Sequence, residues 1–150
     1  MGIPFGLGVG VARLRQERID GAEIAADGTI RISQRRRSEP RVVLEAHSYG
    51  LWCNVSDCTK ATRGVGPFFG LAATGNAIEA FALGVMVAWK DKGTNSATGF
   101  SVGIGVVLDT KVQVLANGFE EGKPLPTGET QIKFETKTMW SPLLVFSRAF

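Results

Sequence analysis

The sequence is poor in cysteine, histidine and charged residues. Its 150 residues include two cysteines and one histidine, and 21% of them are charged against 44% that are apolar. Two cysteines and one distant histidine do not supply the four ligands of a zinc site, so the composition predicts no metal site. Low charge with high apolar content excludes a disordered chain, and the length supports a single domain over residues 1–150.

The sequence also lacks a nucleotide-binding fingerprint, although glycine is abundant. The segments GLGVGV (residues 6–11) and GIGVV (residues 103–107) contain the Gly-x-Gly repeat of phosphate-binding loops. A dinucleotide site needs a third glycine three residues further on and a helix after it, and neither segment has them. We therefore expect no bound cofactor, and we interpret these glycines as the small-residue face of strands.

What the chain has instead is a two-residue alternation of large and small side chains. In residues 3–12, 77–89 and 99–109, large apolar residues occupy one face and glycine, alanine or serine occupies most of the other. A period of two residues is typical of β-strands. Residues 29–49, 65–73 and 131–150 are further strand candidates.

Turn residues separate these segments. They predict a first hairpin tip between Asp20-Gly21 and Asp27-Gly28, a tight turn at Gly75-Asn76, and loops at 53–64, 90–96 and 117–128. The result is an antiparallel fold of six long strands, or of eight if breaks at Pro40 and near Thr138 each divide one.

The small-residue face indicates what surrounds the sheet. A soluble half-buried sheet turns a polar face to water, whereas here that face is almost uncharged over the central strands. Small residues suit the cramped interior of a barrel whose large residues face lipid. Trp52, Trp89 and Trp140 lie near predicted strand ends, where interfacial aromatics belong. We predict an all-β, antiparallel up-and-down β-barrel of 6–8 strands that spans a membrane.

Other folds stay open at this point. A soluble β-barrel or sandwich that binds an apolar ligand or a protein partner would bury both faces. A membrane helix over residues 68–89 is opposed by Glu79 and by Gly75-Asn76 in its middle. A single chain with fewer than eight strands falls below the usual membrane barrels, so an incomplete chain or a homo-oligomeric barrel is also open.

The last strand, Trp140-Ser-Pro-Leu-Leu-Val-Phe-Ser-Arg-Ala-Phe150, resembles the C-terminal strand of small bacterial outer-membrane β-barrel proteins. Leu144, Phe146 and Phe150 fit that pattern, and Arg148 departs from it. The resemblance covers about the last ten residues and implies a Gram-negative outer membrane, contact with its lipids, and recognition by the barrel-assembly machinery. It implies no catalytic residues. Met1 leads into no recognisable export signal, so either a signal peptide or further N-terminal part is absent from this sequence or the membrane interpretation is wrong.

Catalytic residue types meet at one place, where Glu45, His47 and Tyr49 alternate on one face of a strand. Neighbours on one face lie about 6.5–7 Å apart, beyond direct hydrogen-bond reach for many rotamers. Ser48 points to the other face, away from His47, and a nucleophile must touch its base. We therefore interpret the row as a polar network inside the barrel, or as an exposed row near a strand end, rather than as an enzyme site; a lipid-modifying enzyme that uses His47 is the alternative.

Arginines gather on both arms of the first predicted hairpin: Arg13, Arg15, Arg18, Arg31, Arg35, Arg36 and Arg37. Guanidinium groups bind phosphates as bidentate forks, so the first five are candidates for contact with anionic lipid such as lipopolysaccharide. A solvated hairpin whose charges prevent edge pairing explains them as well. Nucleic acid is not expected, because aromatic residues are not interleaved with the arginines.

Cys53 and Cys58 are separated by four residues and would form a disulfide in an oxidising compartment. Taken together, these patterns predict an outer-membrane β-barrel with a structural, adhesive or narrow-channel role and no catalysis.

Overall fold

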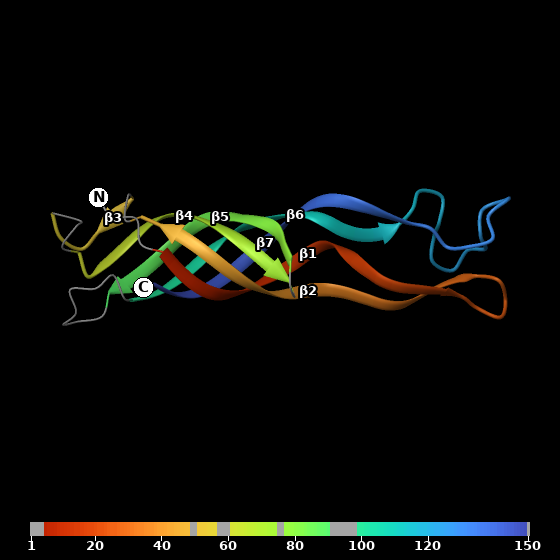
Figure 1. The fold of residues 1–150 in the computed structure, drawn as a ribbon, viewed down its shortest axis with the longest axis horizontal. Helices are drawn as coiled ribbons and strands as arrows, with labels where there is room; N and C mark the ends of the chain where they lie inside the picture. The colour runs from red at the N-terminus through yellow and green to blue at the C-terminus, as the bar shows by residue number, and fades with distance from the viewer. Residues whose placement is uncertain (1–4, 49–50, 57–60, 75–76, 91–98, 150) are drawn as a thin grey trace.

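The computed structural model describes residues 5–48, 51–56, 61–74, 77–90 and 99–149, and these residues form an antiparallel all-β fold. Figure 1 shows an elongated molecule built from one continuous sheet. Its strands are β1 (Phe5–Ile24), β2 (Ile30–His47), β3 (Trp52–Cys53), β4 (Arg63–Thr74), β5 (Ala77–Lys90), β6 (Gly99–Leu115) and β7 (Phe134–Ala149).

Hydrogen bonding closes the six long strands into a ring. The strand order is β2-β1-β7-β6-β5-β4-β3, and β2 also pairs with β4. That closing ladder runs from Val42↔Ala73 to His47↔Phe68. The ring is irregular, because the two-residue β3 lies beside β4 at Val65, and β1 and β7 pair only as far as Ala12↔Leu143.

Four strands continue past the ring as two long hairpins, which we call the extension (residues 13–40 and 110–139). The β1–β2 ladder reaches Ile24↔Ile30, and the β6–β7 ladder reaches Leu115↔Phe134. In Figure 1 the extension projects to the right of the ring. The loop after β6 joins the two hairpins, since Ile30 N donates to Lys123 O at 2.9 Å and Gly122 N donates to Ile30 O at 2.8 Å.

The interior of the ring is filled by side chains that alternate with the outward-facing ones. Phe68 is the largest of them, and it lies over glycines of the neighbouring strands: a Cβ on Gly84 would come within 2.7 Å of Phe68 Cε1. A ring this narrow accepts a phenylalanine because the facing positions carry no side chain. The core consists of Ala12, Val43, Phe68, Ala72, Ala80, Ala82, Met86, Val107, Leu143 and Val145.

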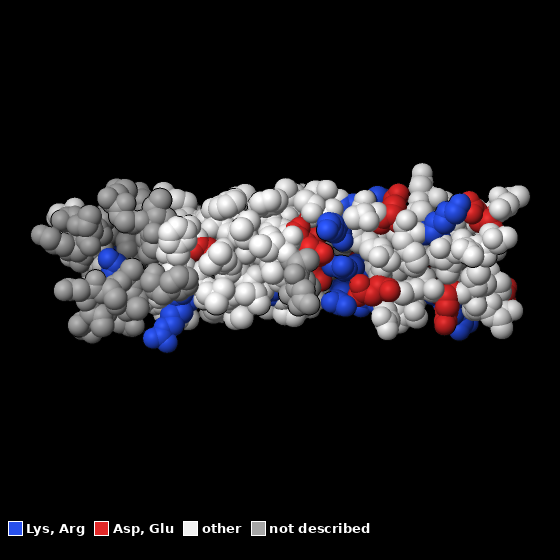
Figure 2. Space-filling model, in the orientation of Figure 1, with Lys and Arg blue, Asp and Glu red and all other residues white. Residues whose placement is uncertain are grey.

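The extension has an apolar centre of its own. Leu14 and Ile19 of β1, Ile30 of β2, and Val112 and Val114 of β6 are all buried there, together with Phe119. Its outer surface carries charged side chains, unlike the outer surface of the ring (Figure 2). The two parts of the molecule therefore present different surfaces to their surroundings.

The predicted alternation is confirmed in β1, β5 and β6, and of the two strand counts left open the structure has the six long strands, without breaks at Pro40 or Thr138. β2 runs through Pro40 without interruption, because β2 pairs with β4 only from Val42 onward and has one unpaired edge at the proline. β7 likewise passes through Thr138 intact. The described residues therefore form six long strands and the short β3.

Two strands are longer than predicted. β1 passes through Asp20-Gly21 with register shifts on either side of Gly21, which absorb the turn-like residues. The hairpin turn lies at Ala25–Thr29, where Gly28 has a φ of 81° and the Asp27 carboxylate accepts a 3.0 Å hydrogen bond from Thr29 N. β6 continues beyond Asp109 to Leu115 after a register shift between Asp109 and Val112.

Candidate functional site

The outer surface of the ring is a continuous belt of large apolar side chains, and it is the first candidate site. The outward positions run from Phe81 to Trp89 on β5 and from Phe100 to Leu108 on β6. In Figure 2 this region is a largely uncharged stretch beside the charged extension. The apolar belt comprises Phe5, Leu7, Val9, Val11, Val42, Leu44, Phe69, Phe81, Leu83, Val85, Val87, Trp89, Phe100, Ile104, Leu108, Trp140, Leu144 and Phe146, all exposed.

Aromatic residues mark both ends of the apolar belt. Trp89 and Phe100 stack with ring centroids 6.2 Å apart at the end where the chain termini lie. Trp140 pairs with Leu108 at the other end, next to the extension. Soluble monomers do not usually expose so large a contiguous apolar surface, and such surfaces commonly mark sites of interaction.

A polar cluster is buried inside the ring near its terminal end. The Glu45 carboxylate accepts a 2.8 Å hydrogen bond from Ser147 Oγ and lies 2.9 Å from His47 Nδ1. Ser101 Oγ is 2.6 Å from Ser147 Oγ. Glu45 is 1% exposed and His47 3% exposed, which matches the predicted interior row. Tyr49, the third predicted member, lies outside the described residues.

The geometry of this cluster corrects the expected separation of Glu45 and His47, and it shows which polar groups contact each other. Glu45 and His47 were expected to lie beyond direct reach, yet both side chains turn toward each other within the ring. The carboxylate sits between the serine and the imidazole, whereas nucleophilic catalysis needs the hydroxyl to contact its base directly. The contacts described here suit a structural network that satisfies buried polar groups.

A second buried polar cluster, not foreseen from the sequence, lies where the ring meets the extension. Arg41 Nη2 donates to Glu39 Oε2 at 2.5 Å and to Asp109 Oδ2, and all three side chains are at most 1% exposed. Arg18 adds a 3.1 Å ion pair to Glu39. Asp109 was visible in the sequence only as the expected end of a strand, so nothing there placed it opposite Arg41.

The predicted arginine group is divided by the structure. Arg18 and Arg35 are held by carboxylates: Arg18 by Asp20 and Glu39, and Arg35 by Glu17 and Glu121. Two further arginines are also ion-paired, Arg36 with Asp20 and Arg37 with Glu17. The arginines of the first hairpin therefore largely belong to a network of paired charges, because acidic residues of β1, β2 and the loop after β6 face them.

Arg13, Arg15 and Arg31 form no ion pair within the part of the chain that the structure describes. Arg31 is exposed on the extension. Arg15 places its guanidinium 3.4 Å from the centroid of the Trp140 ring, a cation–π contact. Arg13 and Arg15 line a surface cleft of about 540 Å³ together with Leu14, Glu17, Arg37, Trp140 and Pro142.

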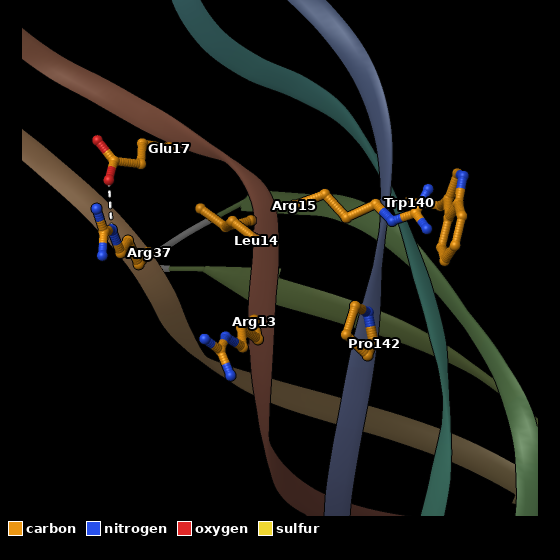
Figure 3. Close-up of a pocket in the computed structure, with 7 residues that line it drawn as sticks. All are labelled: Arg13, Leu14, Arg15, Glu17, Arg37, Trp140 and Pro142. Carbon is orange, nitrogen blue, oxygen red and sulfur yellow. Dashed lines mark hydrogen bonds and ion pairs between the residues drawn. The ribbon is translucent and has the colours of Figure 1, made fainter.

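Figure 3 shows how the cleft is framed. Arg13 and Arg15 leave β1 and splay apart, with Arg15 crossing to Trp140 on β7 and Arg13 lying toward β2. Glu17 is turned to Arg37, whose hydrogen bond holds the pKa of the Glu17 carboxyl below its ordinary value of 4.5. Since Glu17 already neutralises Arg37 and shares Arg35, the uncompensated charge of the cleft resides on Arg13 and Arg15.

Cys53, at the end of β3, is disulfide-bonded. Its predicted partner Cys58 lies outside the described residues, so the Cys53–Cys58 pairing stays a prediction. Within the described ranges, no cluster of three or more His, Cys, Asp or Glu side chains suits a metal ion. Nor do those ranges contain a helix long and apolar enough to cross a membrane.

Comparison with known proteins found no similarity: no protein-family model, no curated protein and no solved structure matches this chain. The functional argument therefore depends on the geometry of the apolar belt, the two buried polar clusters and the arginine cleft.

Proposed function

We propose that this chain is a transmembrane β-barrel of a bacterial outer membrane, in which the ring spans the bilayer and the extension stands outside it. The observation that carries the proposal is the apolar belt, which surrounds a ring whose backbone groups pair from strand to strand. Closed hydrogen bonding is what a sheet needs in hydrocarbon, because lipid offers no partner to an exposed edge.

The height of the apolar belt fits a bilayer. Its rows on β5 and β6 each cover nine residues, from Phe81 to Trp89 and from Phe100 to Leu108. A membrane-spanning strand needs about 9–11 residues at a tilt near 45°. Trp89 and Trp140 then stand at the two interfaces, where aromatic girdles flank the apolar band of such barrels.

The interior favours a structural or adhesive role over transport. Six strands make a narrower ring than the eight of the smallest usual bacterial barrels. Between its two polar clusters, the interior is filled by an apolar core in which Phe68, Met86 and Leu143 lie together with small residues. We infer that the ring anchors the chain and that the extension, with its own core and charged surface, is the part that meets other molecules.

The test is folding into lipid vesicles, followed by flotation and by gels of boiled and unboiled samples. We expect the protein to float with vesicles and to migrate differently when unboiled. A protein that is monodisperse in plain buffer, stays with the aqueous fraction and shows no heat-dependent shift would be the soluble barrel or sandwich instead.

Paired substitutions make this test specific to the belt. Leu83→Arg places a charge in the middle of the apolar belt and should reduce the stability of the inserted form by about 2–4 kcal/mol. Gln34→Arg adds the same charge on the exposed surface of the extension and should leave insertion unchanged. Equal insertion by both variants would show that the belt does not face lipid.

A further inference from the structure

The cleft at the base of the extension continues into the apolar belt. A second hollow of about 660 Å³ is lined by Val11, Arg13, Val85, Ile104, Pro142, Leu144 and their neighbours. It shares Arg13 and Pro142 with the arginine cleft, so the two hollows adjoin on the outer surface. One end of the combined groove is cationic, and the other is lined by exposed aliphatic side chains.

We propose that this groove binds a single phosphate-bearing lipid, with its phosphate in the cleft that Arg13 and Arg15 line and an acyl chain along Val11, Ile104 and Leu144. The proposal rests on the proposed membrane location of the ring. Of the five arginines that the sequence suggested for lipid contact, the proposal keeps Arg13 and Arg15, which act together. Arg18 and Arg35 are already ion-paired with carboxylates.

Charge is the first argument for an anionic headgroup. Arg13 and Arg15 lie on one face of β1, and no carboxylate pairs with either among the residues that the structure describes. Glu17, the acidic residue of the cleft, is bound by Arg37 and Arg35. A phosphate monoester can accept hydrogen bonds from both guanidinium groups, and such charge-assisted bonds are the strong ones.

Position is the second argument. Val11 is the last belt residue of β1, and Arg13 and Arg15 are the next two outward positions on the same strand. Trp140 marks the same level on β7, and its ring holds the Arg15 guanidinium at 3.4 Å. The two cations therefore stand at the boundary of the apolar belt, where a lipid phosphate would lie if the belt is in hydrocarbon.

The amphiphilic shape of the groove excludes a free anion as the best ligand. Inorganic phosphate would use the cationic end alone and make no contact with the groove along Ile104 and Leu144. A neutral lipid would fill that apolar part and leave both guanidinium groups without a partner. A lipid phosphate monoester uses both parts at once.

The experiment is native mass spectrometry of the full chain in detergent, titrated separately with phosphatidic acid, with diacylglycerol of the same acyl chains, and with inorganic phosphate. We expect one phosphatidic acid to bind about a hundredfold more tightly than diacylglycerol, since a charge-assisted hydrogen bond from each of the two arginines contributes about tenfold. Inorganic phosphate should show no comparable one-to-one complex.

Three variants identify the residues. Arg13→Gln and Arg15→Gln should each weaken phosphatidic acid binding by about tenfold. Arg31→Gln removes the same charge from an exposed site outside the groove and should bind like the wild type. Arg13→Lys keeps the charge without the fork, so we expect an intermediate loss. Each variant is first shown to keep the heat-dependent gel shift of the folded protein.

Two results would overturn the proposal. One is equal binding of phosphatidic acid and diacylglycerol, and the other is a loss in Arg31→Gln as large as in Arg13→Gln. Either result leaves the membrane barrel standing if the protein still floats with vesicles. Failure of flotation, by contrast, would remove the membrane barrel itself.

Discussion

The aromatic side chain of Phe68 lies against the backbone of Gly84 inside the closed ring of β-strands. A Cβ built on Gly84 would come 2.7 Å from Phe68 Cε1 and 2.6 Å from Gly105 Cα. The glycine at this position is therefore a packing requirement, because a methyl group has no room between the facing strand and the phenylalanine.

Gly84→Ala should destabilise the folded protein by about 1–3 kcal/mol, the usual effect of overpacking a filled interior. Gly21→Ala is the matched control, since its Cβ would be close to Ser33 Oγ, the movable end of an exposed side chain. Urea titration of the protein in vesicles, followed by the heat-dependent gel shift, measures both. Equal midpoints for the two variants would contradict the packing argument.

The buried ion cluster predicts a different response. Asp109→Asn removes one partner of Arg41 and leaves buried charge uncompensated, which should reduce the free energy of unfolding by about 3–5 kcal/mol. Arg36→Gln breaks an ion pair whose arginine side chain is 51% exposed, and it should change stability by about 0–1 kcal/mol.

The same urea titration compares the two variants. If Asp109→Asn is no more destabilising than Arg36→Gln, the cluster does not hold the ring and the extension together in the way its contacts indicate.

Acid should weaken the extension through Glu17. Its pKa is lowered in the folded protein by the hydrogen bond from Arg37 and by the charges of Arg37 and Arg35. A lowered folded-state pKa means that the ion pairs contribute stability above the unfolded value of 4.5, and that this contribution is lost as the pH falls through the folded value.

Unfolding midpoints at pH 7 and pH 3 therefore should differ less for Glu17→Gln than for the wild type. An identical pH dependence in the two proteins would show that Glu17 does not contribute to the acid response.

Much of the sheet follows from local pattern. The alternation in β1, β5 and β6 predicted which residues face outward, because successive side chains of a strand point to opposite faces of the sheet. The same period put Glu45 and His47 on one face of their strand, and in the structure both side chains are buried inside the ring.

The sequence could not predict which strands, distant from each other in the chain, pair in the sheet. Pro40 and Asp20-Gly21 suggested breaks, but whether a strand continues there depends on which edge is unpaired and where a bulge absorbs a residue. Asp109 and Arg41 are 68 positions apart in the chain, and only the closing of the ring brings them together.

The arginine cleft illustrates the same limit. All seven arginines of the first hairpin look alike in sequence, and their roles differ only through the carboxylates that face them. Arg13 and Arg15 stand apart from Arg18 and Arg35 because Glu17, Asp20, Glu39 and Glu121 face the latter pair.

The most direct test of the membrane account is the collision accessibility of a nitroxide label at two positions in vesicles. A label at Ile104, which is 68% exposed in the middle of the apolar belt, should collide with oxygen far more than with a water-soluble nickel chelate. A label at Gln34 on the extension should show the reverse preference. Preference for the nickel chelate at Ile104 would mean that the belt faces water, and it would contradict the proposed transmembrane barrel.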